Sequence, residues 1–376
     1  MTPANQNKVS MRAAILESAG KPLSVVSDVA IAAPGPGQVR VKVENCGVCH
    51  SDLSLVDGAF PGPVPIILGH EAAGVVDALG PSVRDLKIGD PVILTPCPPC
   101  GTCYFCVRGE ASLCVDTIGL LTNAFPDGST GLSRGEDRVY RGLNVAAFAQ
   151  YVVTSERGAV RIDADVPLDV ACVIGCAVQT GVGAVLNTAG VEEGATVLVM
   201  GLGGIGLNVV QGARLAGASR IFASDPVAER REAAKAFGAT DLLDPSALDV
   251  VEHTRSATAV GVDYAFETAG LSALVQQGIA ATRNGGTTVC VGAPPIDQNI
   301  EIAPASLFTV SGKKLLGCVL GSVHSLHEIP RMIALWKAGR IDLESLITQR
   351  RPLAEINEAM DDLRASRGIR TVLQIG

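Results

Sequence analysis

The segment Thr196–Asp225 reads TVLVMGLGGIGLNVVQGARLAGASRIFASD, and it decides the fold of this chain. It begins with the apolar run Thr196–Met200, whose length and β-branched residues are typical of a buried strand. Glycines in a GxGxxG spacing follow, then apolar residues at helical spacing, and then a second apolar run, Ile221–Ala223. The segment therefore predicts a strand, a tight turn, a helix and a second strand that ends at an acid.

Each glycine of this turn has its own geometric reason. Gly201 permits the sharp turn out of the strand, Gly203 lets a pyrophosphate approach the backbone, and Gly206 lets the helix pack closely on the sheet. The free N–H groups and partial positive charge of the helix N-terminus favour phosphates. The Asp225 carboxylate can accept both hydroxyls of an adenosine ribose and repels a 2′-phosphate. We therefore predict an NAD site rather than an NADP site; the alternative is an ordinary glycine-rich turn.

Length, composition and charge limit the other possibilities. The 376 residues suffice for two domains, and 47% hydrophobic with 18% charged residues is typical of a globular protein. The net charge of −8, without any basic block, argues against nucleic acid or an anionic membrane as partner. The N-terminus, MTPANQNKVS, lacks the pattern of a signal peptide, and no apolar run has the length of a membrane span. We expect a cytoplasmic protein.

The eleven cysteines are expected to be metal ligands or buried thiols rather than disulfides, since no secretion signal is recognised. The segment Pro96–Cys114 reads PCPPCGTCYFCVRGEASLC, with the spacing C-x2-C-x2-C-x2-C-x7-C. Four thiolates around one ion form a closed tetrahedral zinc site, and the alternative is a cluster of free thiols. Five cysteines compete for four positions, and the spacing leaves open whether Cys97 or Cys114 is the extra one.

A second candidate metal site is divided between two segments. Asn45–Asp52 reads NCGVCHSD, and Leu68–Glu71 reads LGHE about twenty residues later. The CxxCH pattern is also that of a c-type haem attachment, which we discount without an export signal. A thiolate and an imidazole from two loops suit zinc, and such a site needs at least one further ligand.

The remaining sequence predicts two kinds of architecture. Residues 11–45 are β-rich, and we expect an antiparallel, partly open β domain there. The polar, glycine-rich segment 116–145 is predicted to be a long loop, of the kind that is usually functional or part of an interaction surface. After Asp225 helices and strands alternate, which predicts a doubly wound parallel sheet, with helices at Glu229–Phe237 and Ala273–Thr282 and strands at Val262–Glu267 and Thr287–Gly292.

With these motifs in view, the chain resembles the zinc-dependent alcohol dehydrogenase family of the medium-chain dehydrogenase/reductase superfamily. The resemblance rests on GVCHSD at 47–52, GHEAAG at 69–74, the cysteine lobe at 100–114, GCAVQTGVGA at 175–184, GLGGIG at 201–206 and GIRTVLQ at 368–374. It implies a Rossmann doubly wound parallel-sheet cofactor domain inserted in a β-rich GroES-like catalytic domain. The implied division is residues 1–177 (with a structural zinc lobe at 97–114), 178–320 and 321–376.

The resemblance also assigns two zinc ions per chain. The catalytic zinc is expected on Cys49, His70 and Cys176, with Glu71 behind the metal. The structural zinc is expected on Cys100, Cys103, Cys106 and Cys114, which makes Cys97 the extra cysteine. Zinc then acts as a Lewis acid on the alcohol or carbonyl oxygen.

For the cofactor and the proton, the resemblance implies further residues. Thr180 and Gly292 are expected beside the nicotinamide, and Ile205 lies within the glycine-rich turn. Residues expected near the rest of the cofactor are His50 and Arg370 at the pyrophosphate and Arg230 at the adenosine ribose. Ser51 is expected to take the alcohol proton, since it stands two residues after Cys49; the alternative is a plain loop serine.

The implied activity is reversible, NAD-dependent oxidation of primary alcohols to aldehydes by hydride transfer. Phe60 and Pro96 are expected in the substrate pocket and favour aromatic, allylic or medium-chain alcohols. One alternative is a formaldehyde dehydrogenase that acts on a thiol adduct, and another is a non-catalytic structural member of the superfamily. Cys176 argues against the polyol dehydrogenases, which often have glutamate as the third ligand. We expect a homo-oligomer, a dimer rather than a tetramer, with the β-rich residues 300–318 pairing across a two-fold axis to extend the sheet.

Overall fold

The computed structural model describes residues 8–302 and 304–376, so the N-terminal residues 1–7 lie outside the described part of the chain. The described chain forms two compact units. The first contains residues up to Cys176 together with His324–Ala334 and Leu343–Gly376, and the second contains Ala177–Val323 and Leu335–Asp342. The second unit thus takes in a short segment beyond the expected middle domain, and the Gln211 side chain bonds to the Asp342 backbone in both directions there.

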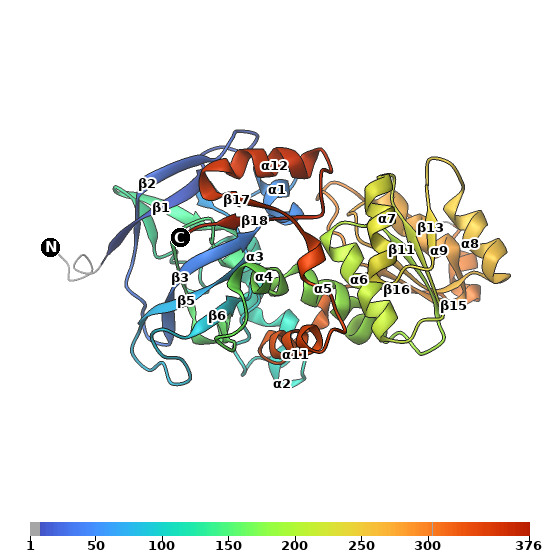
Figure 1. Ribbon diagram of the computed structural model, residues 1–376, viewed down its shortest axis with the longest axis horizontal. Helices are drawn as coiled ribbons and strands as arrows, with labels where there is room; N and C mark the ends of the chain where they lie inside the picture. The colour runs from blue at the N-terminus through green and yellow to red at the C-terminus, as the bar shows by residue number, and fades with distance from the viewer. Residues whose placement is uncertain (1–7, 303) are drawn as a thin grey trace. The chain divides into compact units, whose positions relative to one another are not determined.

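A small closed barrel forms one part of the first unit (Figure 1). Its strands, in spatial order, are β1 (Val9–Leu16), β2 (Ser24–Ile31), β7 (Leu132–Arg134), β8 (Asp137–Arg141) and β4 (Ile66–Ile67). The segment predicted as a long loop supplies β7 and β8, so that prediction is wrong for residues 132–141. These strands are short, and their pairing with β2 and β4 stabilises them.

A seven-stranded sheet forms the other part of the first unit. Its order is β10 (Ala159–Arg161), β6 (Pro91–Leu94), β5 (Glu71–Leu79), β3 (Gln38–Gly47), β18 (Arg370–Gln374) and β17 (Ile347–Pro352), with β9 (Tyr151–Ser155) also paired to β3. Strand β18 pairs with β3 so that Val372 lies opposite Gly47. This register brings the last strand beside the segment that leads to Cys49.

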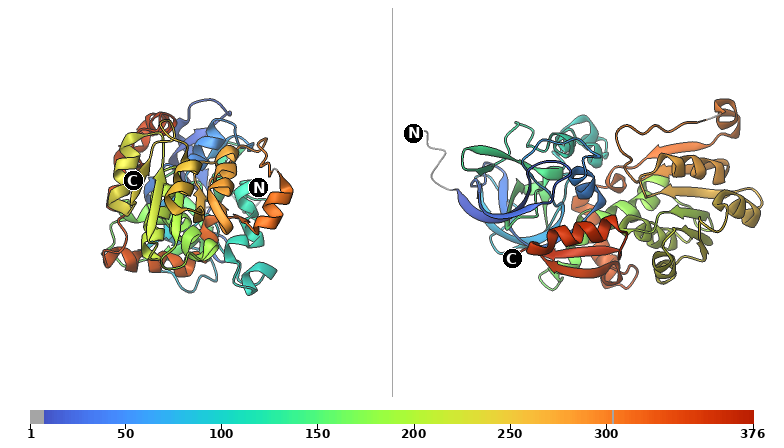
Figure 2. Two further views of the ribbon diagram at one scale, coloured as in Figure 1. Left: turned by 90° about the vertical axis from the view of Figure 1, so that its right-hand side faces the viewer. Right: turned by 90° about the horizontal axis from the view of Figure 1, so that it is seen from above.

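Short helices cover the strands of this unit. They are α1 (His50–Val56), α2 (Tyr104–Val107), α3 (Gly119–Thr122), α4 (Leu168–Ala171), α11 (Ser325–Lys337, whose last turn belongs to the second unit) and α12 (Ile356–Arg364). Figure 2 shows α12 alongside β17 and β18. One apolar core runs through the barrel and the sheet, with Ile15, Val41, Ile67 and Phe148 all fully buried.

The second unit is built on a six-stranded parallel sheet, as predicted. Its order is β13 (Asp241–Leu243), β12 (Arg220–Ser224), β11 (Thr196–Met200), β14 (Val262–Glu267), β15 (Thr282–Cys290) and β16 (Lys314–Gly317). The helices of this unit are α5 (Ala177–Gly183), α6 (Gly204–Leu215), α7 (Ala228–Phe237), α8 (Val250–Thr258), α9 (Ser272–Ala281) and α10 (Ala305–Ser311) (Figure 2). The chain is therefore a Rossmann-type domain inserted in a β-rich domain.

The segment 300–318 was expected to pair across a two-fold axis. The described residues of the segment 300–318 form the helix α10 and the single strand β16, so this segment is less β-rich than predicted. In the described part of the chain, no single helix is long and apolar enough to cross a membrane, although the bent pair Leu168–Gly175 and Ala177–Ala189 meets the length and composition criteria together.

Candidate zinc centres and dinucleotide turn

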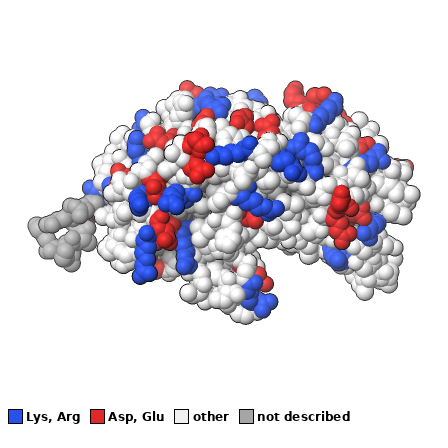
Figure 3. Space-filling model, turned by 60° about the horizontal axis from the view of Figure 1, so that its bottom comes forward, with Lys and Arg blue, Asp and Glu red and all other residues white. Residues whose placement is uncertain are grey.

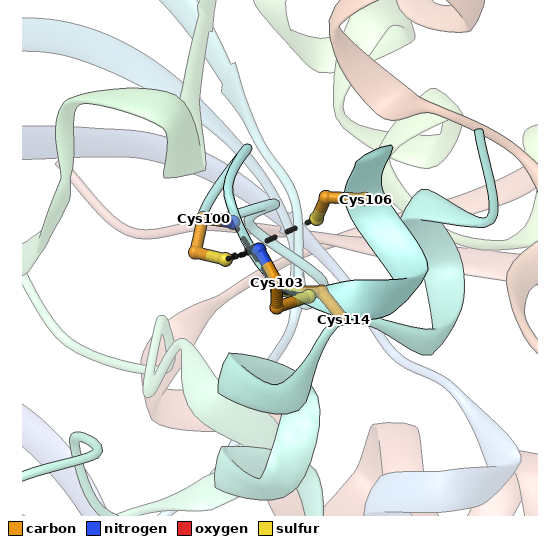
Figure 4. Close-up of side chains that lie close together, drawn as sticks. All are labelled: Cys100, Cys103, Cys106 and Cys114. Carbon is orange, nitrogen blue, oxygen red and sulfur yellow. Dashed lines mark hydrogen bonds between the residues drawn. The ribbon is translucent and has the colours of Figure 1, made fainter. Parts of the chain in front are cut away.

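The cysteine lobe brings four sulfur atoms together. Cys100, Cys103, Cys106 and Cys114 each offer a sulfur atom within 4.8 Å of the others. Figure 4 shows these four side chains pointing toward one another from α2 and the turns around it. The sulfur atoms of Cys100 and Cys106 are 4.0 Å apart, and those of Cys103 and Cys114 are 3.9 Å apart. This is the ligand set of a closed tetrahedral zinc site.

Backbone N–H groups surround these sulfur atoms. The Cys103 N–H donates to the Cys100 sulfur at 3.3 Å, and the Cys100 N–H donates to the Cys114 sulfur at 3.2 Å. Backbone donors from Val115 and Cys106 lower the pKa of Cys103 to about 6, so this thiol ionises readily. Burial raises the pKa of Cys114 to about 12. A bound zinc ion would deprotonate the remaining thiols, so the donor chemistry of the lobe fits this metal.

Cys97 lies outside this cluster. Its side chain is 3% exposed, and burial raises the pKa of its thiol to about 12. The Cys97 N–H donates to the Thr95 hydroxyl, which also bonds to the Ser325 hydroxyl at 2.9 Å. Cys97 is therefore a buried, protonated thiol beneath the lobe.

A second cluster lies where α1 and β5 begin. Cys49 is the N-cap residue of α1, and His70 and Glu71 stand at the start of β5. Cys176 follows the short helical turn Cys172–Gly175. One ligand atom from each of Cys49, His70, Glu71 and Cys176 lies within 4.8 Å of the others. Residues from three distant segments thus converge on one buried point, with two thiols and one imidazole as the softer donors.

Hydrogen bonds and burial prepare this cluster for a cation. The hydrogen bond from Cys176, with further help from His70, holds the pKa of Cys49 well below its ordinary value despite burial. Burial by itself lowers the pKa of His70, but the nearby Asp52 carboxylate and Cys49 together raise it well above its ordinary value. The cluster therefore favours a thiolate at Cys49, whereas the hydrogen bond with Cys49 and burial raise the pKa of Cys176 well above its ordinary value. A bound zinc ion would deprotonate Cys176 as well.

Asp52 orients the histidine, and the sequence analysis missed this residue. Its side chain is fully buried. One carboxylate oxygen accepts from the Gly69 N–H at 2.9 Å and faces His70 Nδ1 at 3.2 Å, while the other accepts from the Cys49 N–H at 3.2 Å. This arrangement leaves His70 Nε2 free to bind a metal. The available signal was an acid three residues after Cys49, the spacing of a capping box at a helix start.

Glu71 and Arg370 complete the buried charges. The Arg370 guanidinium lies 3.4 Å from a Glu71 oxygen and donates to the Val48 carbonyl at 2.8 Å. Burial raises the pKa of Glu71 to about 8, with Arg370 acting in the opposite direction. Both Glu71 oxygens are buried and lack a hydrogen-bond partner. A divalent cation, or a water molecule bound to it, would satisfy these oxygens, so this second cluster also fits zinc.

The other predicted residues of this unit lie near the second cluster in sequence. His50 is exposed and begins α1, and Ser51 is half-buried in the same first turn. Phe60 is half-buried against the apolar core, and Pro96 is buried between β6 and the cysteine lobe. Arg370 contacts Glu71 of the cluster, and its expected position near the pyrophosphate stays a prediction.

The dinucleotide turn of the second unit has the predicted form. Gly201 has φ +94°, a left-handed conformation that favours glycine. A Cβ at Gly206 would overlap the Gly201 carbonyl oxygen, and a Cβ at Gly203 would meet nothing within 4 Å. Ile205 lies in the first turn of α6, where free N–H groups are available. Close packing against the Gly201 carbonyl thus requires glycine at position 206, whereas the space beside Gly203 is open.

Asp225 directly follows β12 and holds the turn. One carboxylate oxygen accepts from the Leu202 N–H at 2.7 Å and the other from the Val227 N–H at 2.8 Å. Arg230, in the first turn of α7, is half-buried. Thr180 is buried on α5, and Gly292 follows β15. Asp225 therefore stabilises the turn and also stands where a ribose ligand is expected.

Comparisons with known proteins agree with this geometry. Residues 35–164 match the model of the alcohol dehydrogenase GroES-like domain, and residues 204–338 match that of zinc-binding dehydrogenases. A zinc-binding alcohol dehydrogenase domain protein from Burkholderia ambifaria is 34% identical with a TM-score of 0.93, over 98% of this chain and 100% of that one. Benzyl alcohol dehydrogenase from Acinetobacter calcoaceticus is 31% identical with a TM-score of 0.92, over 98% and 100%. A zinc-binding dehydrogenase from Sinorhizobium meliloti, solved with NADP, is 30% identical with a TM-score of 0.80, over 98% and 100%.

Proposed function

Because this chain belongs to the zinc-dependent alcohol dehydrogenase family, we propose that it is an NAD-dependent oxidoreductase that interconverts primary alcohols and aldehydes. The observation that carries the proposal is the buried cluster of Cys49, His70 and Cys176 beside the unsatisfied oxygens of Glu71. Two thiolates and one imidazole form the ligand set of alcohol dehydrogenase catalytic zinc, with a fourth position left for water or substrate.

The chain's own residues prepare the reaction. Cys49, His70 and Cys176 would hold a zinc ion, which would supply Lewis-acid polarisation of the substrate oxygen. Asp52 keeps His70 in one tautomer and one orientation through its contact with Nδ1. Ser51, in the first turn of α1, receives the alcohol proton and passes it toward solvent.

The cofactor preference is proposed from Asp225. Its carboxylate is 4% exposed and stands at the end of β12. A negative charge there favours the two ribose hydroxyls of NAD and repels the 2′-phosphate of NADP. The S. meliloti relative binds NADP, so the preference of this chain needs a direct test.

The substrate class is proposed from Phe60, Pro96 and the likeness to benzyl alcohol dehydrogenase. In a substrate pocket, an aromatic ring at position 60 and a compact proline at position 96 would favour aromatic, allylic or medium-chain alcohols.

Location and partners belong to the same proposal. Eleven free cysteines, with no disulfide in the described chain, fit a reducing compartment such as the cytoplasm. Figure 3 shows acidic and basic side chains interspersed on one face, which favours a small-molecule substrate over nucleic acid. A homodimer is proposed from the exposed apolar residues Leu307 and Val310 of α10 and from the edge strand β16, and light scattering would test it.

The decisive experiment is reduction of NAD, with NADP in parallel, by a panel of ethanol, medium-chain, allylic and benzylic alcohols. We expect the highest kcat/KM with NAD and aromatic or long alcohols. Asp225→Ser should lower kcat/KM for NAD about tenfold or more, since a hydrogen bond to a charged group contributes about 1.5–3 kcal/mol. Asp249→Ser is the matched control, because Asp249 is an exposed helix cap that serine can replace.

Three outcomes would contradict the proposed function. Turnover of formaldehyde only when a small thiol is added would replace the proposal by the thiol-adduct alternative. Turnover with NADP alone would refute the interpretation of Asp225. Full zinc content without turnover of any alcohol in the panel would refute the proposed substrate class.

A further inference from the structure

A strained segment lies in the first unit between β8 and β9. Three residues other than glycine have left-handed backbone torsions there: Leu143 with φ 50°, Asn144 with φ 64° and Ala146 with φ 70°. The left-handed conformation is unfavourable for residues with a Cβ, although asparagine tolerates it better than leucine or alanine. Such residues persist only where surrounding contacts hold them, and they cluster near functional sites.

Arg141 provides the most unusual of these contacts. It ends β8, and its side chain is 2% exposed. Nη1 donates to Asn144 Oδ1 at 2.9 Å, Nη2 donates to the Val153 carbonyl at 2.9 Å, and the guanidinium carbon lies 3.7 Å from the ring centroid of Phe125. No carboxylate of the described residues forms an ion pair with Arg141, and burial lowers its pKa to about 9. The protein therefore buries a cation that stays charged at neutral pH in order to keep these contacts.

Asn144 connects this strained segment to the chain that leads into the cysteine lobe. Its side chain is 4% exposed, and Nδ2 donates to the Pro96 carbonyl at 3.0 Å. The Leu143 N–H donates to Asn123 Oδ1 at 3.1 Å, which fixes the same turn from the other side. The segment is thus tied to the residue expected in the wall of the substrate pocket.

The same segment is also tied to the chain that carries His70. The Ala147 N–H donates to the Gly69 carbonyl at 2.8 Å, and the Phe148 N–H donates to the Leu68 carbonyl at 2.8 Å. One step earlier, Ile67 of β4 lies opposite Arg141 in the parallel pair of β4 and β8. The peptide that precedes His70 therefore rests on residues held directly or indirectly by Arg141.

We propose that Arg141 is a positioning residue for the catalytic zinc centre: its buried guanidinium holds the left-handed segment Leu143–Ala146, which fixes both the peptide before His70 and the Pro96 carbonyl. The part that concerns Pro96 rests on the proposed function, since it takes this residue to border the alcohol. Arginine suits the task because its planar fork bonds two acceptors while it stacks on an aromatic ring, which a lysine ammonium does not do.

The test compares Arg141→Lys and Arg141→Met with Arg138→Met in the intact protein. Arg138 is exposed on the same strand and serves as the matched control. Cobalt(II) exchanged into the catalytic site reports ligand geometry through its absorption bands and requires no turnover. We expect both Arg141 variants to shift these bands and to change the kcat/KM ratio of benzyl alcohol to ethanol about fivefold or more, whereas Arg138→Met keeps both at wild-type values.

Asn144→Asp separates the two effects that we assign to Arg141, on the Pro96 carbonyl and on the peptide before His70. It keeps the oxygen that accepts from Arg141 and removes the amide donor to Pro96. We expect a changed alcohol ratio with an unchanged cobalt spectrum, since the Ala147 to Gly69 bond remains.

The results that overturn the proposal are distinct. If both Arg141 variants lower only the melting temperature and match Arg138→Met in cobalt spectrum and alcohol ratio, Arg141 is merely structural. If Asn144→Asp keeps the wild-type ratio, the effect assigned to the Pro96 carbonyl is wrong. If the wild-type protein oxidises no alcohol, the proposed function fails, while the cobalt spectra still decide the role of Arg141. Arg141→Lys carries the test if Arg141→Met does not fold.

Discussion

Replacing Asp52 with asparagine tests the support of the catalytic zinc site. The two carboxylate oxygens of Asp52 accept from the Gly69 N–H and the Cys49 N–H and face His70 Nδ1. An asparagine has only one oxygen, so its NH₂ group must face at least one of these donors. Whichever way the amide turns, a buried backbone N–H loses its acceptor.

The magnitude follows from burial. Asp52 is fully buried, so an unsatisfied donor costs about 1–3 kcal/mol of folding free energy. The loss of a carboxylate behind a metal-binding histidine typically lowers metal affinity about 10–100-fold. We therefore expect Asp52→Asn to lower both the melting temperature and the zinc affinity of the catalytic site, with the cysteine lobe unaffected.

The assay is competition with a chelator, followed by metal analysis, together with thermal unfolding. Asp57→Asn is the matched control, because Asp57 is the C-cap residue of the same helix and forms an exposed ion pair with Arg364 worth about 0–1 kcal/mol. Wild-type zinc retention and melting temperature in Asp52→Asn would refute the role assigned to this carboxylate.

Three further predictions concern the lobe, the turn and the sheet. Cys106→Ser should leave one zinc per chain instead of two, as measured by metal analysis, and retention of both would refute the lobe as a zinc site. Gly206→Ala should lower the melting temperature, because a Cβ there overlaps a backbone carbonyl oxygen. Gly203→Ala should keep the wild-type melting temperature and weaken NADH binding in a fluorescence titration. Equal melting temperatures of the two variants would contradict the packing assigned to Gly206. Burial raises the pKa of Asp263, but hydrogen bonds from Thr196 and Arg283 outweigh burial and lower it. The stability that the Asp263 carboxylate adds is therefore present above about pH 4 and is lost as pH falls through its folded-state pKa. Asp263→Asn should therefore flatten the acid side of the stability profile measured by denaturant unfolding, and an unchanged profile would be evidence against this ion pair.

The second unit was predictable because its signals are local. The strand Thr196–Met200, the glycine turn, an amphipathic helix and Asp225 follow one another within thirty residues, and each restricts the backbone on its own. The strand Val262–Glu267 was predicted with the bounds that the structure has. The cysteine lobe is local in the same sense, because its four sulfur atoms come from fifteen consecutive residues.

Features that depend on distant partners were harder to predict. Strands β7 and β8 lie in a polar, glycine-rich segment, and only pairing with β2 and β4 makes them part of a barrel. Asp52 looks like a surface acid in the sequence, yet it is fully buried because three donors converge on it. Likewise, the left-handed torsion of Leu143 has no local signal, since nothing in a leucine favours it.

The place of β18 in its sheet sets the order in which this protein can mature on the ribosome. Strand β3 (Gln38–Gly47) pairs with β18 (Arg370–Gln374) through Asn45–Gly47, so the sheet of the first unit stays incomplete until β18 has been synthesised. All strands of the second unit are made earlier, and this unit can form while the first still exposes β3. Closing so long a loop is slow, so the part of β3 that β18 covers, Asn45–Gly47, stays unpaired in the nascent chain, whereas β9 already pairs with Gln38–Lys42. Arg370 arrives with that last strand, so the metal cluster gains its buried cation only when the sheet closes.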